Sequence, residues 1–254
     1  MISSNKKPVG IKTADNTIAV EHKKEKINLD TSNAKKPEEK PVAAKIKKQD
    51  NGKASGFYLL ATGGTDAGST KLFSFSNSTI TPKYGIGIGY QLNQKLSVQT
   101  GFYVTNKKYI ASPYDYHAKA GSYWSEVQME KVIAACLVYE IPITVRYNFI
   151  QRPKVTYYGT VGTSSYIMKK EDYDYFYTSY NMPHEKSWQY TGNKHFFSTL
   201  TFAAGIEKKL SGEISLIFEP SFSIPIAGVG DGKVKLFSSS LQVGMKYKPF
   251  KKHQ

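Results

Sequence analysis

The amino-acid sequence predicts an all-β protein, an eight-stranded antiparallel transmembrane β-barrel that follows a disordered N-terminal arm. Eight stretches alternate between bulky apolar residues and small or polar residues. Only a period of two, that of a β-strand, places these two sets on opposite faces. The connections between the stretches are short and long in turn, as in closed antiparallel barrels that cross an outer membrane.

The N-terminal half of the expected barrel holds four strands. The stretch 56–65 carries apolar residues on both faces, and we count it because an antiparallel barrel closes most simply on an even number of strands. In 84–91 and 95–104, aromatic and aliphatic residues alternate with Gly, Ser, Gln and Lys. The stretch 137–149 is the clearest, since its odd positions are Leu, Tyr, Ile, Ile, Val, Tyr and Phe.

The C-terminal half holds four more strands. The stretches 155–167 and 196–207 place Val, Tyr, Ile, Phe and Leu opposite Thr, Gly, Ser and Ala. The stretches 213–224 and 237–248 place similar apolar residues opposite Glu, Ser, Gln and Lys. Because the period is two, a slip of one residue would exchange the faces, so the pattern also specifies the register.

The composition of the polar face indicates which face points outward. A soluble barrel of the lipocalin type, which would bind an apolar small molecule, keeps its apolar face inside. Its solvated face usually carries Lys, Glu and Arg in mid-strand. Here the middle of the polar face is mostly Gly, Ser, Thr and Ala, which fit a narrow lumen. We therefore expect the apolar face to contact lipid, with Leu137, Ile141, Val145, Phe218, Leu241 and Val243 among its residues.

A change in composition near residue 54 divides the chain. Residues 1–53 contain no Phe, Trp or Tyr, so this segment cannot bury enough apolar surface to offset its conformational entropy. We expect a disordered, Lys-rich arm or linker there and a barrel domain over 54–254. The net charge of +15 is spread over arm, loops and C-terminus. This distribution favours outer-membrane lipid and lipopolysaccharide as partners and disfavours nucleic acid.

The lengths of the connections assign the two sides of the membrane. The short ones are 93–94, 151–153 and 211–212, and the long ones are 66–81, 106–132, 169–195 and 226–233. Short turns of outer-membrane barrels face the periplasm, and long loops face the outside. Both termini are therefore expected in the periplasm of a Gram-negative bacterium.

Four short motifs carry a family resemblance. They are Tyr139-Glu140-Ile141-Pro142-Ile143-Thr144-Val145-Arg146-Tyr147, Tyr158-Gly159-Thr160-Val161-Gly162, Phe218-Glu219-Pro220-Ser221 and Val243-Gly244-Met245-Lys246-Tyr247. Through them, 57–250 resembles the outer-membrane β-barrel family that includes the PorT-type proteins. The resemblance implies an eight-stranded outer-membrane barrel in a family most of whose members have no assigned biochemical activity.

Charged residues on the polar face predict an ion network in the lumen. Glu140 and Arg146 share the inward face of one strand, and Glu219 lies on the inward face of another. An unpaired buried ion is strongly destabilising, so we expect these three side chains to be linked. A gated pore or a proton path is the functional alternative, although eight strands leave room only for side chains.

The sequence predicts no catalytic, cofactor or metal site. His117, His184 and His195 fall in long loops near acidic residues, without a hydrolase motif or metal-ligand spacing. Cys136 is the only cysteine and lies on the polar face, where we expect a small buried side chain. An envelope lipid-modifying enzyme with its site at the outer rim remains an alternative.

The two longest loops are rich in aromatic residues. Exposed aromatic side chains at this density suggest recognition of a protein, a glycan or lipopolysaccharide. The candidates are Tyr114, Trp124, Tyr173, Tyr175, Tyr177 and Trp188. The structural alternative is that the flanking strands continue past the membrane as a hairpin whose aromatic residues pack on 109–124, and the two are compatible.

Together these patterns favour a non-enzymatic, monomeric outer-membrane barrel. Its long outer loops would act as a surface-binding module or as an accessory part of an envelope assembly.

Overall fold

The computed structural model describes residues 55–72 and 78–249. The strands are β1 (Gly56–Ser69), β2 (Ile80–Gln91), β3 (Leu96–Ala111), β4 (Gln128–Gln151), β5 (Val155–Ser179), β6 (Met182–Tyr190), β7 (Lys194–Lys209), β8 (Ile214–Pro225) and β9 (Phe237–Tyr247), with one short 3-10 helix, η1 (Tyr123–Ser125). The arm expected over 1–53 lies outside the described residues. Within the described ranges, no helix is long and apolar enough to cross a membrane.

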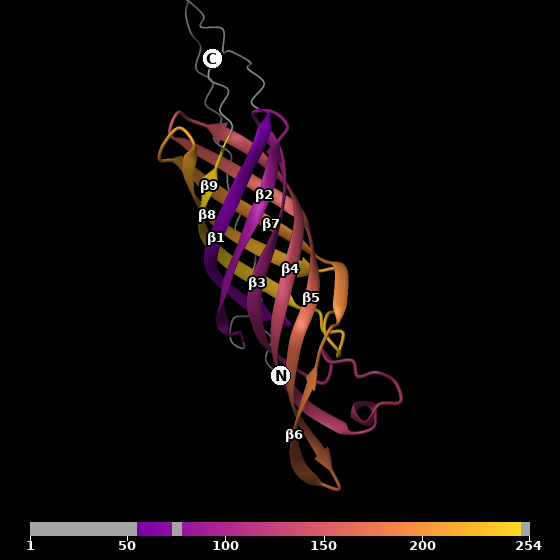
Figure 1. Cartoon of the computed structure of the whole chain (residues 1–254). Helices are drawn as coiled ribbons and strands as arrows, with labels where there is room; N and C mark the ends of the chain where they lie inside the picture. The colour runs from indigo at the N-terminus through magenta and orange to yellow at the C-terminus, as the bar shows by residue number, and fades with distance from the viewer. Residues whose placement is uncertain (1–54, 73–77, 250–254) are drawn as a thin grey trace, which may run out of the picture. The chain divides into compact units, whose positions relative to one another are not determined.

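Eight of the strands close into one antiparallel barrel (Figure 1). The order around the barrel is β1, β2, β3, β4, β5, β7, β8 and β9. Strand β9 then pairs with β1, with Leu59 opposite Tyr247. Every barrel strand therefore has a neighbour on both edges, and the predicted eight-stranded fold is confirmed.

Strand β6 is not a barrel strand. The first part of β5, up to Ile167, pairs with β7, whereas its last part, from Glu171 to Ser179, pairs with β6. Tyr180 and Asn181 connect β5 to β6 with φ angles of 51° and 59°, as a tight two-residue hairpin turn requires. The segment 169–195, expected to be a loop, is thus mostly strand.

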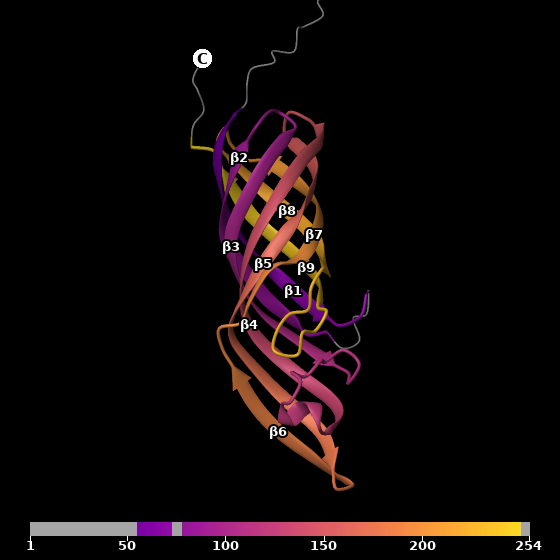
Figure 2. The ribbon, with the colours of Figure 1, turned by 90° about the vertical axis from the view of Figure 1, so that its right-hand side faces the viewer.

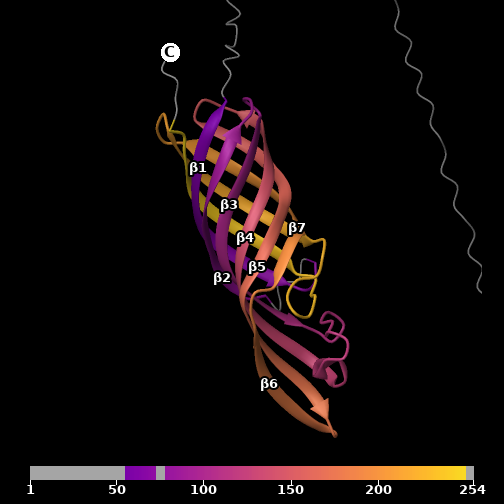
Figure 3. The ribbon, with the colours of Figure 1, turned by 45° about the vertical axis from the view of Figure 1, so that its right-hand side comes forward.

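The connections sort to the two ends of the barrel as expected. The short turns join β2 to β3, β4 to β5 and β7 to β8. In the first of these, Asn93 Oδ1 accepts hydrogen bonds from the N–H groups of Lys95 and Leu96 at 2.8 and 2.9 Å, which fixes the turn. The connections between the other neighbouring barrel strands are longer, and the one from β5 to β7 contains β6. In Figure 3 the β5–β6 hairpin projects beyond the opposite end of the barrel.

The barrel is apolar outside and polar inside. Ile86, Val145 and Phe218 are 67%, 40% and 44% exposed, whereas Arg146 and Lys246 are each 1% exposed. A soluble lipocalin-like barrel has the reverse distribution, so that alternative is wrong. The residues predicted to face outward, Leu137, Ile141, Val145, Phe218, Leu241 and Val243, all lie on the face opposite to the buried one.

Glycines on the inner face make room for the aromatic rings that fill the lumen. A Cβ atom at Gly89 would lie 2.2 Å from the ring of Tyr58, and one at Gly205 would lie 2.3 Å from the ring of Tyr158. Both rings are fully buried. The small residues of the polar face therefore have a packing role.

Candidate functional site

The lumen near the short turns holds two cations around one carboxylate. Arg146 Nη2 and Lys246 Nζ both donate to Glu207 Oε2, Lys246 at 3.0 Å. The Arg146 guanidinium lies 3.5 Å from the ring centre of Tyr158, and Lys246 Nζ lies 4.2 Å from that of Tyr58. The faces of these aromatic rings add to the stabilisation of the cations.

A second ion pair lies farther along the lumen. Lys83 Nζ donates to Glu140 Oε2 at 2.7 Å, and Ser164 Oγ donates to Glu140 Oε1 at 2.8 Å. Each oxygen of the carboxylate therefore has its own donor. Lys83 Nζ also lies 5.6 Å from the ring centre of Tyr103.

A third ion pair is the most enclosed. Lys107 Nζ donates to Asp66 Oδ2 at 2.7 Å, and the hydroxyls of Ser238 and Ser240 donate to Asp66 Oδ1 at 2.5 and 2.6 Å. The Lys107 and Asp66 side chains are 1% and 0% exposed. Buried charges are stable in a low-dielectric interior only when they are paired and hydrogen-bonded, and both groups of this pair are.

The structure does not pair Glu140 with Arg146 directly, because Glu140 pairs with Lys83 and Arg146 with Glu207. Glu140 and Arg146 belong to different clusters, because six residues of one strand separate them by about 20 Å. Glu219 interacts with Tyr158 and, electrostatically, with both Arg146 and Lys83. The sequence interpretation also missed Lys83, Lys107 and Asp66, since it began the second strand at residue 84 and placed Asp66 and Lys107 in loops. Each of the three lies an even number of residues from the small residues of the polar face, and this alternation could have identified them as inward-facing.

The described lumen is filled by side chains. Arg146, Lys107 and Lys246 are each 1% exposed. Tyr158 and Tyr58, beside Arg146 and Lys246, are fully buried. Eight-stranded barrels have an interior only just wide enough for side chains. The interior is thus a packed core with ionic cross-links between strands.

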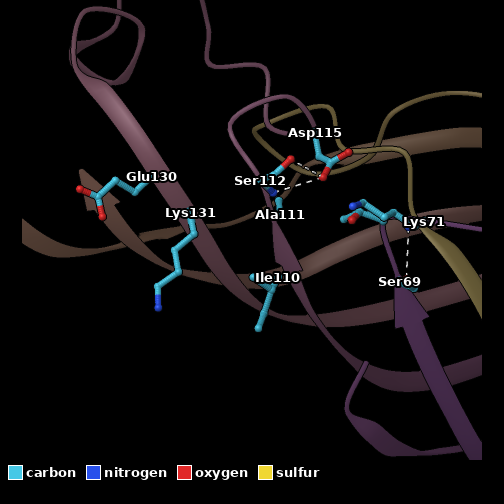
Figure 4. Close-up of a pocket in the computed structure, with 9 residues that line it drawn as sticks. Ser69, Lys71, Ile110, Ala111, Ser112, Asp115, Glu130 and Lys131 are labelled. Carbon is cyan, nitrogen blue, oxygen red and sulfur yellow. Dashed lines mark hydrogen bonds between the residues drawn. The ribbon is translucent and has the colours of Figure 1, made fainter. Parts of the chain in front are cut away.

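A pocket lies at the end of the barrel away from the short turns. Its lining is Ser69, Thr70, Lys71, Ile110, Ala111, Ser112, Asp115, Glu130 and Lys131. Asp115 Oδ2 accepts hydrogen bonds from the N–H and the hydroxyl of Ser112 at 3.2 and 2.7 Å. Figure 4 shows Glu130 and Lys131 pointing apart.

Beyond the barrel, β4, β5 and β6 continue as a sheet with an aromatic core, seen below the barrel in Figure 2. We call this sheet, with the loop 112–127 that packs on it, the outer extension. Trp124 stacks on Tyr175 with 3.9 Å between ring centres, and the hydroxyls of Tyr116 and Tyr175 are 2.8 Å apart. Burial raises the pKa of both hydroxyls, so both stay protonated.

Six aromatic residues were predicted to form an exposed recognition surface, and four of them are buried. Tyr173, Tyr175, Tyr177 and Trp124 are 1%, 0%, 7% and 8% exposed, whereas Tyr114 and Trp188 are 91% and 50% exposed. The reason is that β5 keeps its alternation beyond the barrel and turns its tyrosines onto the loop. The alternative, a hairpin whose aromatic residues pack on this loop, is the arrangement that the structure has.

An exposed patch lies along β6, on the same face as the buried tyrosines. Lys186 Nζ is 5.7 Å from the ring centres of both Tyr123 and Trp188. The His184 ring stacks on that of Tyr177 with 5.5 Å between centres. Tyr123 and Trp188 are about half exposed. The patch thus combines cationic and aromatic side chains, the composition of many binding surfaces.

A buried carboxylate fastens the base of the outer extension. Glu171 accepts hydrogen bonds from the Tyr173 hydroxyl and from Asn193 Nδ2, both at 2.6 Å, and from the N–H of Asp231 at 3.2 Å. The loop between β8 and β9 is held further because the N–H of Gly230 donates to His195 Nε2 at 2.9 Å. Glu171 therefore joins two loops to β5.

The three histidines considered for catalysis lie in three different settings. His195 binds the Gly230 backbone, His184 stacks on Tyr177, and His117 lies 3.3 Å from the carbonyl oxygen of Asp115. Cys136 is buried in the lumen. Among the described residues, no group of three His, Cys, Asp or Glu side chains could hold a metal ion.

The closed sheet, the ion-paired interior and the apolar exterior define a transmembrane β-barrel of the outer-membrane class. No known family pattern and no curated protein sequence matches this chain. Its PorT-type resemblance therefore stays a prediction.

Several solved structures are similar in fold. Neisserial surface protein A is 14% identical, with a TM-score of 0.45, over 76% of this chain and 97% of that one. Ail, the attachment invasion locus protein of Yersinia pestis, is 12% identical, with a TM-score of 0.38, over 76% and 97% of the chains. The N-terminal β-barrel domain of Pseudomonas aeruginosa OprF is 10% identical, with a TM-score of 0.34, over 76% and 99%.

Proposed function

We propose that this protein is a non-enzymatic outer-membrane barrel whose outer extension is a recognition surface. The observation that carries the proposal is the contrast between the two parts. The lumen is filled by ion pairs and aromatic rings, whereas β5 carries the barrel wall onward into a braced sheet with an exposed edge. A filled lumen supports the interpretation that the barrel anchors the outer extension in the membrane.

The proposal includes an orientation in the outer membrane of a Gram-negative bacterium. Short turns of such barrels face the periplasm, so both termini would lie there and the outer extension would lie outside the cell. The apolar exterior would contact lipid, and exposed lysines near the outer rim, such as Lys108 and Lys170, would meet the phosphates of lipopolysaccharide.

The partner would be a protein or a glycan that meets the patch of Tyr123, His184, Lys186 and Trp188. Support comes from the mixture of an ammonium group and half-exposed aromatic rings. The PorT-type resemblance, carried by 139–147, supports a related role as an accessory part of an envelope assembly, which would use the same surface.

Thiol labelling in intact cells tests the proposal. Tyr114→Cys places a thiol on the outer extension, and Ser211→Cys places one in a short turn, while the native Cys136 is buried and gives little background. A membrane-impermeant maleimide should label residue 114 in intact cells and residue 211 only after the outer membrane is opened. Labelling of 211 but not of 114 in intact cells would contradict the orientation.

A further inference from the structure

Strand β6 leaves one edge of its sheet open. It is the last strand in the sheet order and pairs only with β5 among the described residues. All residues from Met182 to Gln189 are exposed. An open edge presents unpaired N–H and C=O groups, which can bind another strand.

The turn fixes which backbone groups face this edge. In a two-residue hairpin the residues that flank the turn, here Ser179 and Met182, bond to each other, and bonded and non-bonded pairs then alternate. The N–H and C=O groups of Glu185, Ser187 and Gln189 therefore point to the open edge. Pro183, which has no N–H, occupies the same series of positions, where no donor to β5 is needed.

We propose that this edge binds β6 of a second copy of the chain, antiparallel, in a facing membrane. The inference rests on the proposed outward orientation of the outer extension. The hairpin runs away from the barrel (Figures 1 and 2), so an antiparallel strand has to come from a copy that points the opposite way. A copy in the same membrane would present β6 in parallel.

The side chains select one register, centred on Ser187. It places Ser187 opposite Ser187 and Lys186 opposite Trp188, and the latter contact occurs twice in the symmetric pair. Lys186 is already within 5.7 Å of the Trp188 ring of its own chain, and cation–π contacts of this kind are attractive.

The neighbouring registers are less favourable. One centred on Lys186 would place two ammonium groups opposite each other, which is destabilising. One centred on Trp188 would shorten the pairing within β6 from residues 184–190 to residues 186–190. The charges of Glu185 and Lys186 also disfavour strands that do not match them.

The contact is small for a single pair of molecules. It joins about seven residues of each strand, far less than the roughly 1,600 Å² buried by a stable interface. Two membranes that carry many copies gain avidity, by about 10²- to 10⁴-fold for linked sites. A barrel that is monomeric in dilute detergent would therefore still hold vesicles together.

Vesicle aggregation tests the backbone pairing. The full chain is reconstituted into phosphatidylcholine vesicles, and light scattering should rise with time for the wild type and not for vesicles without protein. Ser187→Pro removes the outward N–H and should abolish the rise. Ser187→Ala is the matched control, because both variants lose the hydroxyl bond to Asp174, 2.7 Å in length, and only the proline lacks the N–H. Equal aggregation of the two variants would overturn the proposal.

Cross-linking tests the register. Glu185→Cys and Gln189→Cys are reconstituted separately and treated with a short bis-maleimide, alone and mixed. Opposed residues have Cα atoms about 5.5 Å apart, whereas identical residues are offset by about 13 Å along the strand. Dimers should therefore form only in the mixture, and equal dimer formation in the separate samples would contradict the register.

The outcomes separate this inference from the proposed function. If the maleimide labels Tyr114→Cys on intact cells but wild-type vesicles do not aggregate, the self-pairing is wrong and the outward recognition surface stands. If residue 114 is protected from the reagent, both are wrong.

Discussion

Asp66 and Lys107 form the most enclosed ion pair of the described lumen. Removing one partner of such a pair leaves an uncompensated charge, whereas removing both is far less costly. Lys107→Met should lower the free energy of unfolding by about 3–5 kcal/mol, and the double variant with Asp66→Asn should recover part of that loss. Urea titration in lipid bilayers measures both.

A matched control for this pair lies on the exterior. Lys170 and Asp172 are also 2.7 Å apart, but their side chains are 49% and 45% exposed. Lys170→Met should cost less than about 1 kcal/mol. Equal losses for Lys107→Met and Lys170→Met would show that the lumen pair is not buried as described.

Arg146 and Glu140 should act independently of each other. Arg146 pairs with Glu207, and Glu140 pairs with Lys83. Residues this far apart, without a common hydrogen-bond partner, usually have additive effects within about 0.5 kcal/mol. The loss in Arg146→Ala with Glu140→Ala should therefore equal the sum of the single losses. A coupling energy above about 1 kcal/mol would show that Arg146 and Glu140 interact, as the sequence predicted.

The sequence predicts which charged residues face the lumen, but it does not predict which of them pair. The inward position of Glu140, Arg146 and Glu207 follows from alternation alone. Their pairing depends on how far neighbouring strands are staggered around the closed barrel, which no local pattern specifies. The inward position of Lys107 could have been predicted, because this residue continues the alternation of β3 beyond the point where the expected strand ended.

Among the elements, the β5–β6 hairpin lies beyond the part of β5 that pairs with β7, although its β5 strand still pairs with β4. The barrel part of β5 ends its pairing with β7 at Ile167, before β6 begins to pair at Glu171. Replacing residues 172–189 by Asn-Gly joins Glu171 to Tyr190, which already oppose each other, through a two-residue turn. The shortened chain should keep the heat-modifiable gel migration of a folded barrel. Loss of that migration would show that the hairpin is needed for closure.

The β5–β6 hairpin also shows why the sequence analysis predicts a loop, and not strands, over 169–195. Tyr173, Tyr175 and Tyr177 alternate with Asp172 and Asp174, so a period of two was present in the sequence. The turn at 180–181 is Tyr-Asn, without the glycine that usually marks a tight hairpin.

At the scale of the whole molecule, the apolar exterior requires lipid. Val145 is 40% exposed on the outer face of β4. An Arg on the lipid face costs about 2–4 kcal/mol near the bilayer midplane and about 0–1 near the interfaces. Val145→Arg should lower the free energy of unfolding in bilayers, and Tyr114→Arg, on the outer extension, should leave it unchanged. A destabilised Tyr114→Arg would contradict the position of the extension outside the bilayer.

A membrane-spanning barrel requires that the outer face of β4 contacts lipid. Nitroxide labels at Ile141→Cys, Ile143→Cys and Val145→Cys, each in a Cys136→Ser background, are compared in bilayers by their collision rates with oxygen and with a water-soluble nickel complex. All three labels should collide more with oxygen, which concentrates in lipid, whereas a label at Tyr114→Cys should collide more with nickel. Higher nickel collision rates at 141, 143 and 145 would place this face in water and contradict a membrane-spanning barrel.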